Sequence, residues 1–365
     1  MFSRRAFAGM IAAGLTEAAF AQRAKLSGVA PADTVWINGN EFPEGPPQAS
    51  VDAMAQVIGS SNRYHYQEFP AFYSKLAANE GLTADQILVG AGSSEVLHAA
   101  IEAYTSPSIP LIIPMPTYEA APELARYKGH PVVETPLNSK MAPDVHRLAA
   151  EADKAGGGLI YIVNPNNPTS TITTSDDIAW LVANLPKNTY VLVDEAYLHY
   201  TTSPEASSSL PYVKEGKNVI VARTFSKIYG MAGLRVGYIA GRPDLIARME
   251  PYRNNVISVV SVRAVSAALD LGPKMLEERK AKIVHTRNEL CAWLAESKWK
   301  FIPPQANFVM IETGRDAKQM QAAMLEKGVA IGRPFPPLNT MIRVSIGTDA
   351  EMAKFRRVFT EVVAS

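Results

Sequence analysis

The chain has 365 residues, of which 47% are hydrophobic and 19% are charged, and its formal net charge is +1. A chain of this size can bury a large core, and we expect one large domain followed by a smaller one. The near-neutral charge, with no long basic stripe, argues against nucleic-acid binding and favours a small-molecule partner. The single cysteine, Cys291, excludes an intrachain disulfide, and we predict no metal site.

Residues 1–21 resemble a twin-arginine signal peptide. Arg4 and Arg5 precede an apolar run at residues 8–15, and residues 19–21 (Ala-Phe-Ala) match a small-x-small cleavage site. The run is too short for a comfortable membrane span. We expect a periplasmic or secreted protein without stable membrane insertion after signal removal, or a cytoplasmic one if the signal is not used. The alternative is an amphipathic helix with a chance Arg-Arg pair.

Residues 22–48 are predicted to form an extended N-terminal arm. This stretch is rich in Asn, Gly and Pro, includes Asn40, and precedes a helical pattern at residues 51–58. Such an arm can lie across an active site; the alternative is a disordered leader. A following loop carries the aromatic side chains Tyr64 and Tyr66, and loops carry function disproportionately.

A strand, a glycine-serine turn and a helix follow at residues 86–104. Gly92, Ser93 and Ser94 form the turn. This arrangement directs backbone N–H groups and the positive end of a helix at an anion, so it predicts a phosphate site. The alternative is an ordinary turn, because strand-to-helix turns are commonly rich in Gly and Ser.

The middle of the chain alternates apolar strands with helical stretches such as residues 176–184. This alternation is typical of a doubly wound α/β fold with a mostly parallel sheet, whose ligands bind beyond the carboxyl ends of the strands. Polar and aromatic residues follow each predicted strand at that edge: Tyr118 after 111–113, Asn167 after 158–163, Asp194 and Tyr197 after 191–193, and Ser226 and Lys227 after 218–221.

Lys227 lies between small and hydroxyl-bearing neighbours just after a buried strand, with Arg235 close by in sequence. Partial burial near another cation favours the neutral amine, which can form a Schiff base. Lysine, hydroxyl and arginine together suit a cofactor with an aldehyde and a phosphate, and pyridoxal phosphate is such a cofactor. For a lone Ser-Lys pair the alternative would be a surface lysine.

We place the large domain at residues 49–262 and the small domain at residues 263–365. The small domain begins with helical sequence, including a long charged helix at 274–297, and continues as α+β. Arg343 lies in an otherwise apolar strand, where a buried cation requires an anion. We expect a substrate carboxylate or phosphate there; the alternative is a local salt bridge.

Each of these residues is predicted to have its own role in binding pyridoxal phosphate or in catalysis. Asp194 would keep the ring nitrogen protonated, and Tyr197 and Asn167 would bind the phenolic oxygen. Lys227 would hold the cofactor and then move a proton. Tyr118 would stack on the ring. The phosphate would be held by Gly92, Ser93, Ser94, Thr224, Ser226 and Arg235.

Five motifs together resemble the fold-type I, class I/II aminotransferases, closest to the histidinol-phosphate aminotransferase branch. They are Asn-Pro-Asn-Asn-Pro-Thr at 164–169, Asp-Glu-Ala-Tyr at 194–197, Thr-Phe-Ser-Lys at 224–227, Ala-Gly-Leu-Arg-Val-Gly at 232–237 and Arg-Val-Ser-Ile-Gly at 343–347. The resemblance implies a three-layer αβα large domain and a smaller α+β domain. It also implies transfer of an amino group between an amino acid or amino-alcohol phosphate and a 2-oxo acid.

The resemblance further implies a homodimer in which Tyr64 of one subunit reaches the cofactor phosphate of the other. Asn40 and Tyr66 are then expected near the substrate. Phe42 stands where that branch has an asparagine, and with the tyrosines it favours an aromatic or imidazole side chain. Two alternatives remain: a same-fold decarboxylase or deaminating oxidase, and a non-catalytic sensor.

Overall fold

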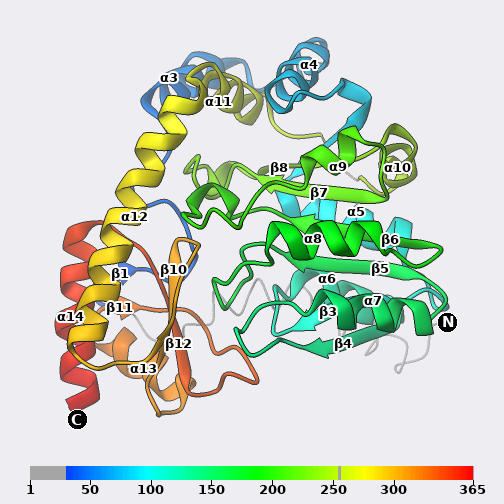
Figure 1. Cartoon of the computed structure of the whole chain (residues 1–365). Coiled ribbons are helices and arrows are strands. Elements are labelled where there is room, and N and C mark those ends of the chain that lie inside the picture. The colour runs from blue at the N-terminus through cyan, green and yellow to red at the C-terminus, as the bar shows by residue number, and fades with distance from the viewer. Residues whose placement is uncertain (1–29, 254–255, 365) are drawn as a thin grey trace, which may run out of the picture.

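A computed structural model describes residues 30–253 and 256–364 of the chain. The predicted signal peptide at residues 1–21 and the start of the predicted arm lie outside the described residues. Figure 1 shows a large body around a central sheet and a smaller body joined to it by a long helix. No helix in the described ranges is both long and apolar enough to cross a membrane.

The large body contains a seven-stranded sheet in the order β2-β8-β7-β6-β5-β3-β4. β8 is antiparallel to both of its neighbours, whereas the other pairs are parallel. This confirms the predicted mostly parallel sheet. The strands are β2 (Ile87–Ala91), β3 (Leu111–Met115), β4 (Val132–Pro136), β5 (Gly158–Val163), β6 (Thr189–Asp194), β7 (Val219–Thr224) and β8 (Val236–Ala240).

Helices cover both faces of this sheet, because its central strands are apolar on both sides. Successive residues of β5 point to opposite faces, so Ile160 and Ile162 pack in one core cluster while Leu159 and Tyr161 pack in another. In Figure 1, α7 and α8 lie in front of the sheet and α5 and α6 behind it. These helices are α5 (Ser93–Tyr104), α6 (Ala120–Tyr127), α7 (Val145–Lys154) and α8 (Ser175–Ala183), with α9 (Leu210–Lys214) and α10 (Pro243–Met249) nearby.

The small body is built on a three-stranded antiparallel sheet in the order β12-β10-β9. Its aromatic core joins Trp293 of the long helix to Phe355 and Phe359 of the last helix. The elements are α12 (Gly272–Glu296), β9 (Phe301–Ile302), β10 (Phe308–Glu312), α13 (Ala317–Glu326), β12 (Met341–Ser345) and α14 (Asp349–Ala364). The predicted charged helix at 274–297 corresponds to α12.

The N-terminal arm connects the two bodies. β1 (Val35–Trp36) pairs in parallel with β11 (Val329–Ala330) of the small body, and the arm then runs to α3 (Gln48–Val57). α3 packs against α11 (Val259–Asp270), where Ser50 Oγ donates a hydrogen bond to Ala264 O at 2.8 Å. α11 therefore spans the domain boundary predicted after residue 262, whereas α4 (Phe69–Glu80) lies beside it.

Candidate active site

Five strands of the large sheet end at the edge that carries the predicted site residues. β7, β6, β5 and β3 are parallel, and β2 points the same way because β2 and β7 are both antiparallel to β8. The loops that follow these strands therefore meet at one edge. This is the arrangement on which the predicted ligand site depended.

Asp194 is the last residue of β6, and its side chain is buried. Oδ1 accepts a hydrogen bond from the Ala196 backbone N–H at 3.1 Å, and Oδ2 accepts one from the Tyr161 hydroxyl at 3.1 Å. Burial raises the pKa of Asp194 to about 6, although these two hydrogen bonds and the nearby charge of Lys227 lower it. A carboxylate shielded in this way interacts strongly with a cationic N–H group.

Lys227 and Tyr197 lie next to each other, and both interact electrostatically with Asp194. Nζ of Lys227 is 5.4 Å from the centre of the Tyr197 ring and donates a hydrogen bond to the Gly39 carbonyl at 3.1 Å. The Tyr197 hydroxyl accepts a hydrogen bond from Asn40 Nδ2 at 3.2 Å. Burial raises the pKa of Tyr197 above its ordinary value, so the phenol keeps its proton at neutral pH and can donate it to an acceptor oxygen.

A cluster of anion-binding groups surrounds Gly92. Thr224 Oγ1 donates a hydrogen bond to Ser226 Oγ at 2.9 Å, and Arg235 Nη1 donates one to the same oxygen at 3.4 Å. The chain turns at Gly92 with a φ of +81°, and α5 begins at Ser93. A Cβ atom at Gly92 would overlap Arg235 Nη2, so glycine allows the guanidinium to lie against the backbone just before the N-terminus of α5.

This cluster fits the phosphate of pyridoxal phosphate. Two hydroxyl groups, one guanidinium and the N-terminal backbone N–H groups of α5 converge on one place, and the positive end of the helix dipole favours an anion there. Ser94 lies in the same first helical turn. The donor set therefore matches a phosphate, and the buried Asp194 at the end of β6 provides the carboxylate that a cofactor ring nitrogen requires.

Arg343 lies in the middle of β12 and is buried. Nη1 donates a hydrogen bond to Asn167 Oδ1 at 2.7 Å, and Nη2 donates one to the Asn38 carbonyl at 2.7 Å. Its guanidinium carbon lies 5.5 Å from the centre of the Phe308 ring and 4.6 Å from that of Phe335. The small body thus places a cation, flanked by aromatic rings, against the loop that follows β5.

Asn40 attaches the arm to this site. Its backbone N–H donates a hydrogen bond to Ser345 Oγ at 2.8 Å, and the same hydroxyl donates one to Asn40 Oδ1 at 2.8 Å. The residue is 1% exposed and has a φ of +54°. Its contacts with Ser345 and Tyr197 connect the small body to the large one directly beside Lys227.

Tyr118 is half-buried and packs against the core beneath the sheet edge. Burial is the main cause of the raised pKa of Tyr161 and of Tyr197, and the nearby phenol of Tyr118 raises both further. Tyr118 therefore lies close to Tyr161 and Tyr197. This position agrees with the predicted stacking role, which stays a prediction.

Tyr64 and Tyr66 occupy a different part of the surface. Their side chains are 70% and 59% exposed, and their rings stack on each other at 5.2 Å. Tyr66 also packs near Phe69 and borders a groove along α4 and α10. The ring contacts described for these two tyrosines do not include the residues around Lys227, so the predicted roles of Tyr64 and Tyr66 stay predictions.

Three residues that hold the site together were not predicted from the sequence: Tyr161, Ser345 and Gly39. Tyr161 is a lone tyrosine in an apolar strand, and a buried hydroxyl requires a partner, so the pattern contained a usable signal. Ser345 and Gly39 carried none, because their contacts depend on how the arm folds back. Phe42 does not lie open toward a substrate: it is 4% exposed and its ring is stacked 3.6 Å from the guanidinium of Arg279.

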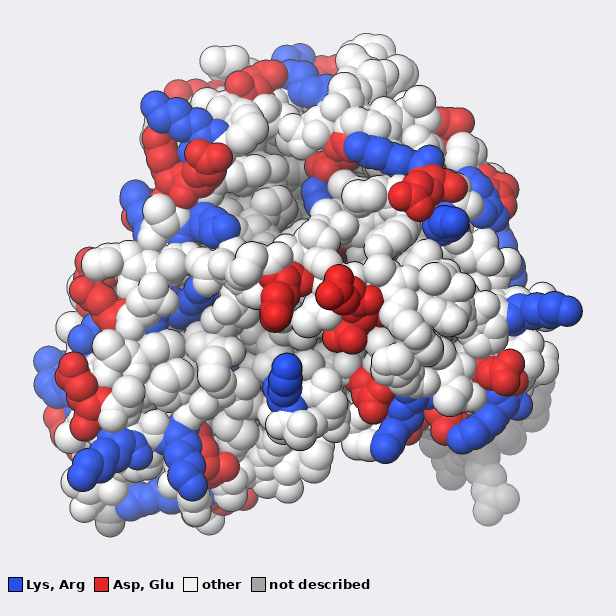
Figure 2. Space-filling view, in the orientation of Figure 1, with Lys and Arg blue, Asp and Glu red and all other residues white. Residues whose placement is uncertain are grey.

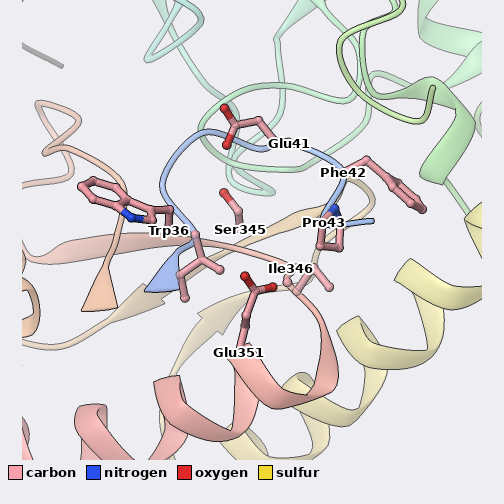
Figure 3. Close-up of a pocket in the computed structure, with 9 residues that line it drawn as sticks. Trp36, Glu41, Phe42, Pro43, Ser345, Ile346 and Glu351 are labelled. Atoms are coloured by element: carbon pink, nitrogen blue, oxygen red, sulfur yellow. The ribbon is translucent and has the colours of Figure 1, made fainter. Parts of the chain in front are cut away.

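A cavity of about 170 Å³ lies where the arm meets the small body. Figure 3 shows Glu41, Phe42 and Pro43 of the arm on one side of it, with Ser345 and Glu351 on the other. Glu351 Oε2 accepts a hydrogen bond from the Thr348 backbone N–H at 2.7 Å. The cavity borders the arm's attachment at Ser345 and lies outside the group of residues around Lys227.

Comparisons with known proteins agree with this chemistry. Residues 32–359 match the model of the family described as aminotransferase class I and II. An aromatic amino acid aminotransferase of Cutibacterium acnes is 33% identical, over 87% of this chain and 90% of the relative. A histidinol-phosphate aminotransferase of Symbiobacterium thermophilum is 34% identical, over 88% of this chain and 89% of the relative.

The fold is also similar to solved structures. The crystal structure of histidinol-phosphate aminotransferase from Sinorhizobium meliloti, in complex with pyridoxal-5'-phosphate, superimposes with a TM-score of 0.83. It is 27% identical in sequence, and the match covers 91% of each chain. The similarity extends over both the large and the small body described here.

Proposed function

Because the chain belongs to the class I and II aminotransferase family, we propose that it moves an amino group from an aromatic or imidazole-bearing donor to a 2-oxo acid. It is a pyridoxal-phosphate-dependent transaminase. The proposed donor class rests on one observation above all: the buried Arg343 guanidinium lies against the rings of Phe308 and Phe335. A charged group bound there would hold an attached flat side chain among aromatic neighbours.

Bound pyridoxal phosphate supplies an electron sink that acidifies the α-hydrogen of the amino donor. Lys227 would anchor the cofactor and then accept and return that proton at Nζ. The Asp194 carboxylate would keep the ring N–H in place, and the Tyr197 phenol would donate a hydrogen bond to the ring oxygen. Thr224, Ser226, Arg235 and the turn at Gly92 would hold the phosphate.

The absorbance spectrum of the purified protein tests this proposal. Wild type is expected to show a visible band from the bound cofactor, and Lys227→Ala should lose it. Lys282→Ala, which removes an exposed lysine paired with Glu44, should keep it. Glutamate, aspartate, phenylalanine and histidinol phosphate are then added in turn, and conversion of the visible band to a near-ultraviolet band identifies the donor.

Two outcomes would contradict the proposal. If no visible band forms in wild type after addition of pyridoxal phosphate, the residues around Lys227 serve binding or structure and not transamination. If carbon dioxide is released from the donor, the chain is a decarboxylase of the same fold; if oxygen is reduced to hydrogen peroxide as the donor is deaminated, it is an oxidase. If the amino nitrogen stays on the cofactor and neither carbon dioxide nor hydrogen peroxide forms, the result supports amino-group transfer.

We also propose that the active enzyme is a homodimer. Tyr64 is 70% exposed on a single chain and is stacked only on a neighbouring tyrosine in the described contacts. An exposed aromatic pair beside a groove is typical of an interface. A partner subunit that buries this surface would bring Tyr64 to the phosphate group of the other site.

We propose, finally, that the twin-arginine-like segment exports the folded protein. Support comes from Arg4 and Arg5 and from the small-x-small pattern at residues 19–21. Cell fractionation would test it: the double change Arg4→Lys and Arg5→Lys should retain the protein in the cytoplasm. An unchanged distribution between compartments would count against the signal.

A further inference from the structure

An ion pair joins the two bodies beside the active site. Nη2 of Arg333, in the loop between β11 and β12, lies 2.5 Å from Oε2 of Glu119 in the large domain. The two side chains are 44% and 33% exposed. Glu119 directly follows Tyr118, the ring predicted to stack on the cofactor, so this ion pair lies next to the candidate site.

Arg333 is also held close to Arg343. The guanidinium carbons of the two arginines lie 4.2 Å and 4.6 Å from the centre of the same ring, that of Phe335. The backbone N–H of Gly332 donates a hydrogen bond to the Arg343 carbonyl at 2.8 Å. Phe335 is 4% exposed, so the ring that both cations contact is part of the packed structure.

Glu119 neutralises the second of these cations. Without that carboxylate, an anion bound at Arg343 would experience two positive charges next to one ring. With it, the positive charge of Arg333 is largely cancelled. Glu123, one turn further along α6, adds a second carboxyl: burial raises its pKa, Glu119 raises it further, and Arg333 lowers it. The carboxyl groups of Glu119 and Glu123 and the guanidinium of Arg333 therefore interact with one another.

The balance of charge suits an anion with one negative charge. A carboxylate carries one negative charge, whereas a phosphate monoester carries roughly 1.5 to 2 negative charges at neutral pH. The additional charge of a phosphate would lie near the Glu119 carboxylate in a partly desolvated site, where repulsion is stronger than in water.

We propose that Glu119 makes the site select 2-amino acids, held through their carboxylate, over amino-alcohol phosphates. This inference rests on the proposed transaminase function and narrows its donor class. Glu119 acts through charge and through Arg333, so it is a specificity-determining residue and not a catalytic one.

Calorimetric titration of the cofactor-loaded enzyme tests the inference with two non-reacting probes. 3-Phenylpropionate carries a carboxylate, and phenyl phosphate carries a phosphate. Wild type should bind the carboxylate more tightly. Glu119→Gln should bind phenyl phosphate roughly fivefold more tightly than wild type, because one repulsive charge is removed from a partly exposed position. Its affinity for 3-phenylpropionate should rise by only roughly two- to threefold, because the same change in charge acts on a ligand that carries a single negative charge.

Two further variants make the test specific. Glu134→Gln removes a carboxylate from another partly exposed ion pair of the large domain, with Arg126, and should leave both affinities unchanged. Arg333→Met leaves Glu119 uncompensated and should weaken phenyl phosphate binding further. Opposite responses of the Glu119 and Arg333 variants would exclude a general loss of folding as the cause.

Steady-state turnover gives the second measurement. The ratio of kcat/KM for phenylalanine to that for histidinol phosphate should exceed one in wild type and fall in Glu119→Gln. A preference of wild type for the phosphate, or equal ratios in the two proteins, would overturn the selection by Glu119 and leave transamination intact. Failure of a broad donor panel to react, together with absence of the cofactor band, would overturn the proposed function and this inference with it.

Discussion

At the scale of single residues, Asp194 links function to pH-dependent stability. Its pKa is raised from 3.8 to about 6 in the folded chain, chiefly by burial. The folded chain therefore favours the protonated form more than the unfolded chain does. The resulting stabilisation is fully present below pH 3.8, and it is lost as the pH rises through about 6.

The cofactor-free Asp194→Asn variant should lack this pH-dependent contribution. Its free energy of unfolding relative to wild type should rise by about 3 kcal/mol between the acid and neutral ends of this range. Its affinity for pyridoxal phosphate should fall, since an amide does not hold the ring nitrogen protonated. Denaturant unfolding at several pH values, with cofactor titration, measures both. A difference in stability that does not vary with pH would contradict the assignment.

Gly92 provides a second test at this scale. Gly92→Ala would place a Cβ atom in the space beside Arg235, at a backbone φ of +81°. We expect cofactor affinity to fall at least about tenfold, because the added Cβ displaces the guanidinium that would bind the phosphate. The control is Gly129→Ala, which has a φ of +74° and no atom within 4 Å of the added Cβ.

Both glycine variants should lose roughly 1–2 kcal/mol of stability from backbone strain. Cofactor titration monitored by absorbance, alongside denaturant unfolding, separates that strain from the local clash. Equal cofactor affinities in the two variants would mean that the position of the Arg235 guanidinium beside Gly92 does not contribute to phosphate binding.

At the scale of elements, the strands and the shared edge were predictable, whereas the cross-contacts were not. Apolar runs such as residues 158–163 have few alternatives to a buried strand, and parallel strands bring their following loops together. Thus Asp194 and Lys227 were assigned to one edge. The stacking of Phe42 under Arg279 was not predictable, because it depends on where the arm meets α12, which no local pattern encodes.

A buried charge network lies at the ends of β6, which carries Asp194, and of β7, which Lys227 follows. Arg223 of β7 donates hydrogen bonds to Glu195 Oε2 at 2.9 Å and to Glu80 Oε2 of α4 at 2.7 Å. The Glu195 side chain is 1% exposed and that of Arg223 is 12% exposed. Such a network would hold the strand ends next to Asp194 and Lys227 in place.

Arg223→Met should therefore reduce the free energy of unfolding by about 3–5 kcal/mol, since it leaves buried carboxylates without their cation. Arg126→Met, at the partly exposed pair with Glu134, should change it by less than about 1 kcal/mol. Urea unfolding of both variants makes the comparison. Similar losses in the two variants would show that the network around Arg223 is not a main support of the strand ends.

At the scale of the whole molecule, the division into a large α/β body and a smaller α+β body followed from the change of pattern along the chain. The boundary after residue 262 stays a prediction; α11 runs across it and packs on α3. Figure 2 shows acidic and basic side chains interspersed over one face, as expected for a net charge of +1. Charge therefore marks no interface on that face, and an interface must be sought in exposed aromatic residues such as Tyr64.

Mixing two inactive variants tests whether Tyr64 acts across a subunit boundary. Tyr64→Ala keeps Lys227 but lacks the tyrosine, and Lys227→Ala keeps the tyrosine but lacks the lysine. If each site combines Lys227 of one subunit with Tyr64 of the other, a mixed dimer contains one complete site. Random reassociation of equal amounts should then restore about a quarter of wild-type activity.

If Tyr64 serves the site of its own chain, or no site at all, a mixed dimer contains no complete pair that its parents lacked. Activity after mixing would then equal the mean of the separate variants. Unfolding and refolding the two proteins together, with each variant refolded alone as the control, provides the comparison. Size-exclusion chromatography with light scattering establishes that dimers have re-formed. Recovery above the mean would require that Lys227 and Tyr64 of one working site come from different chains, because neither parent protein can supply both.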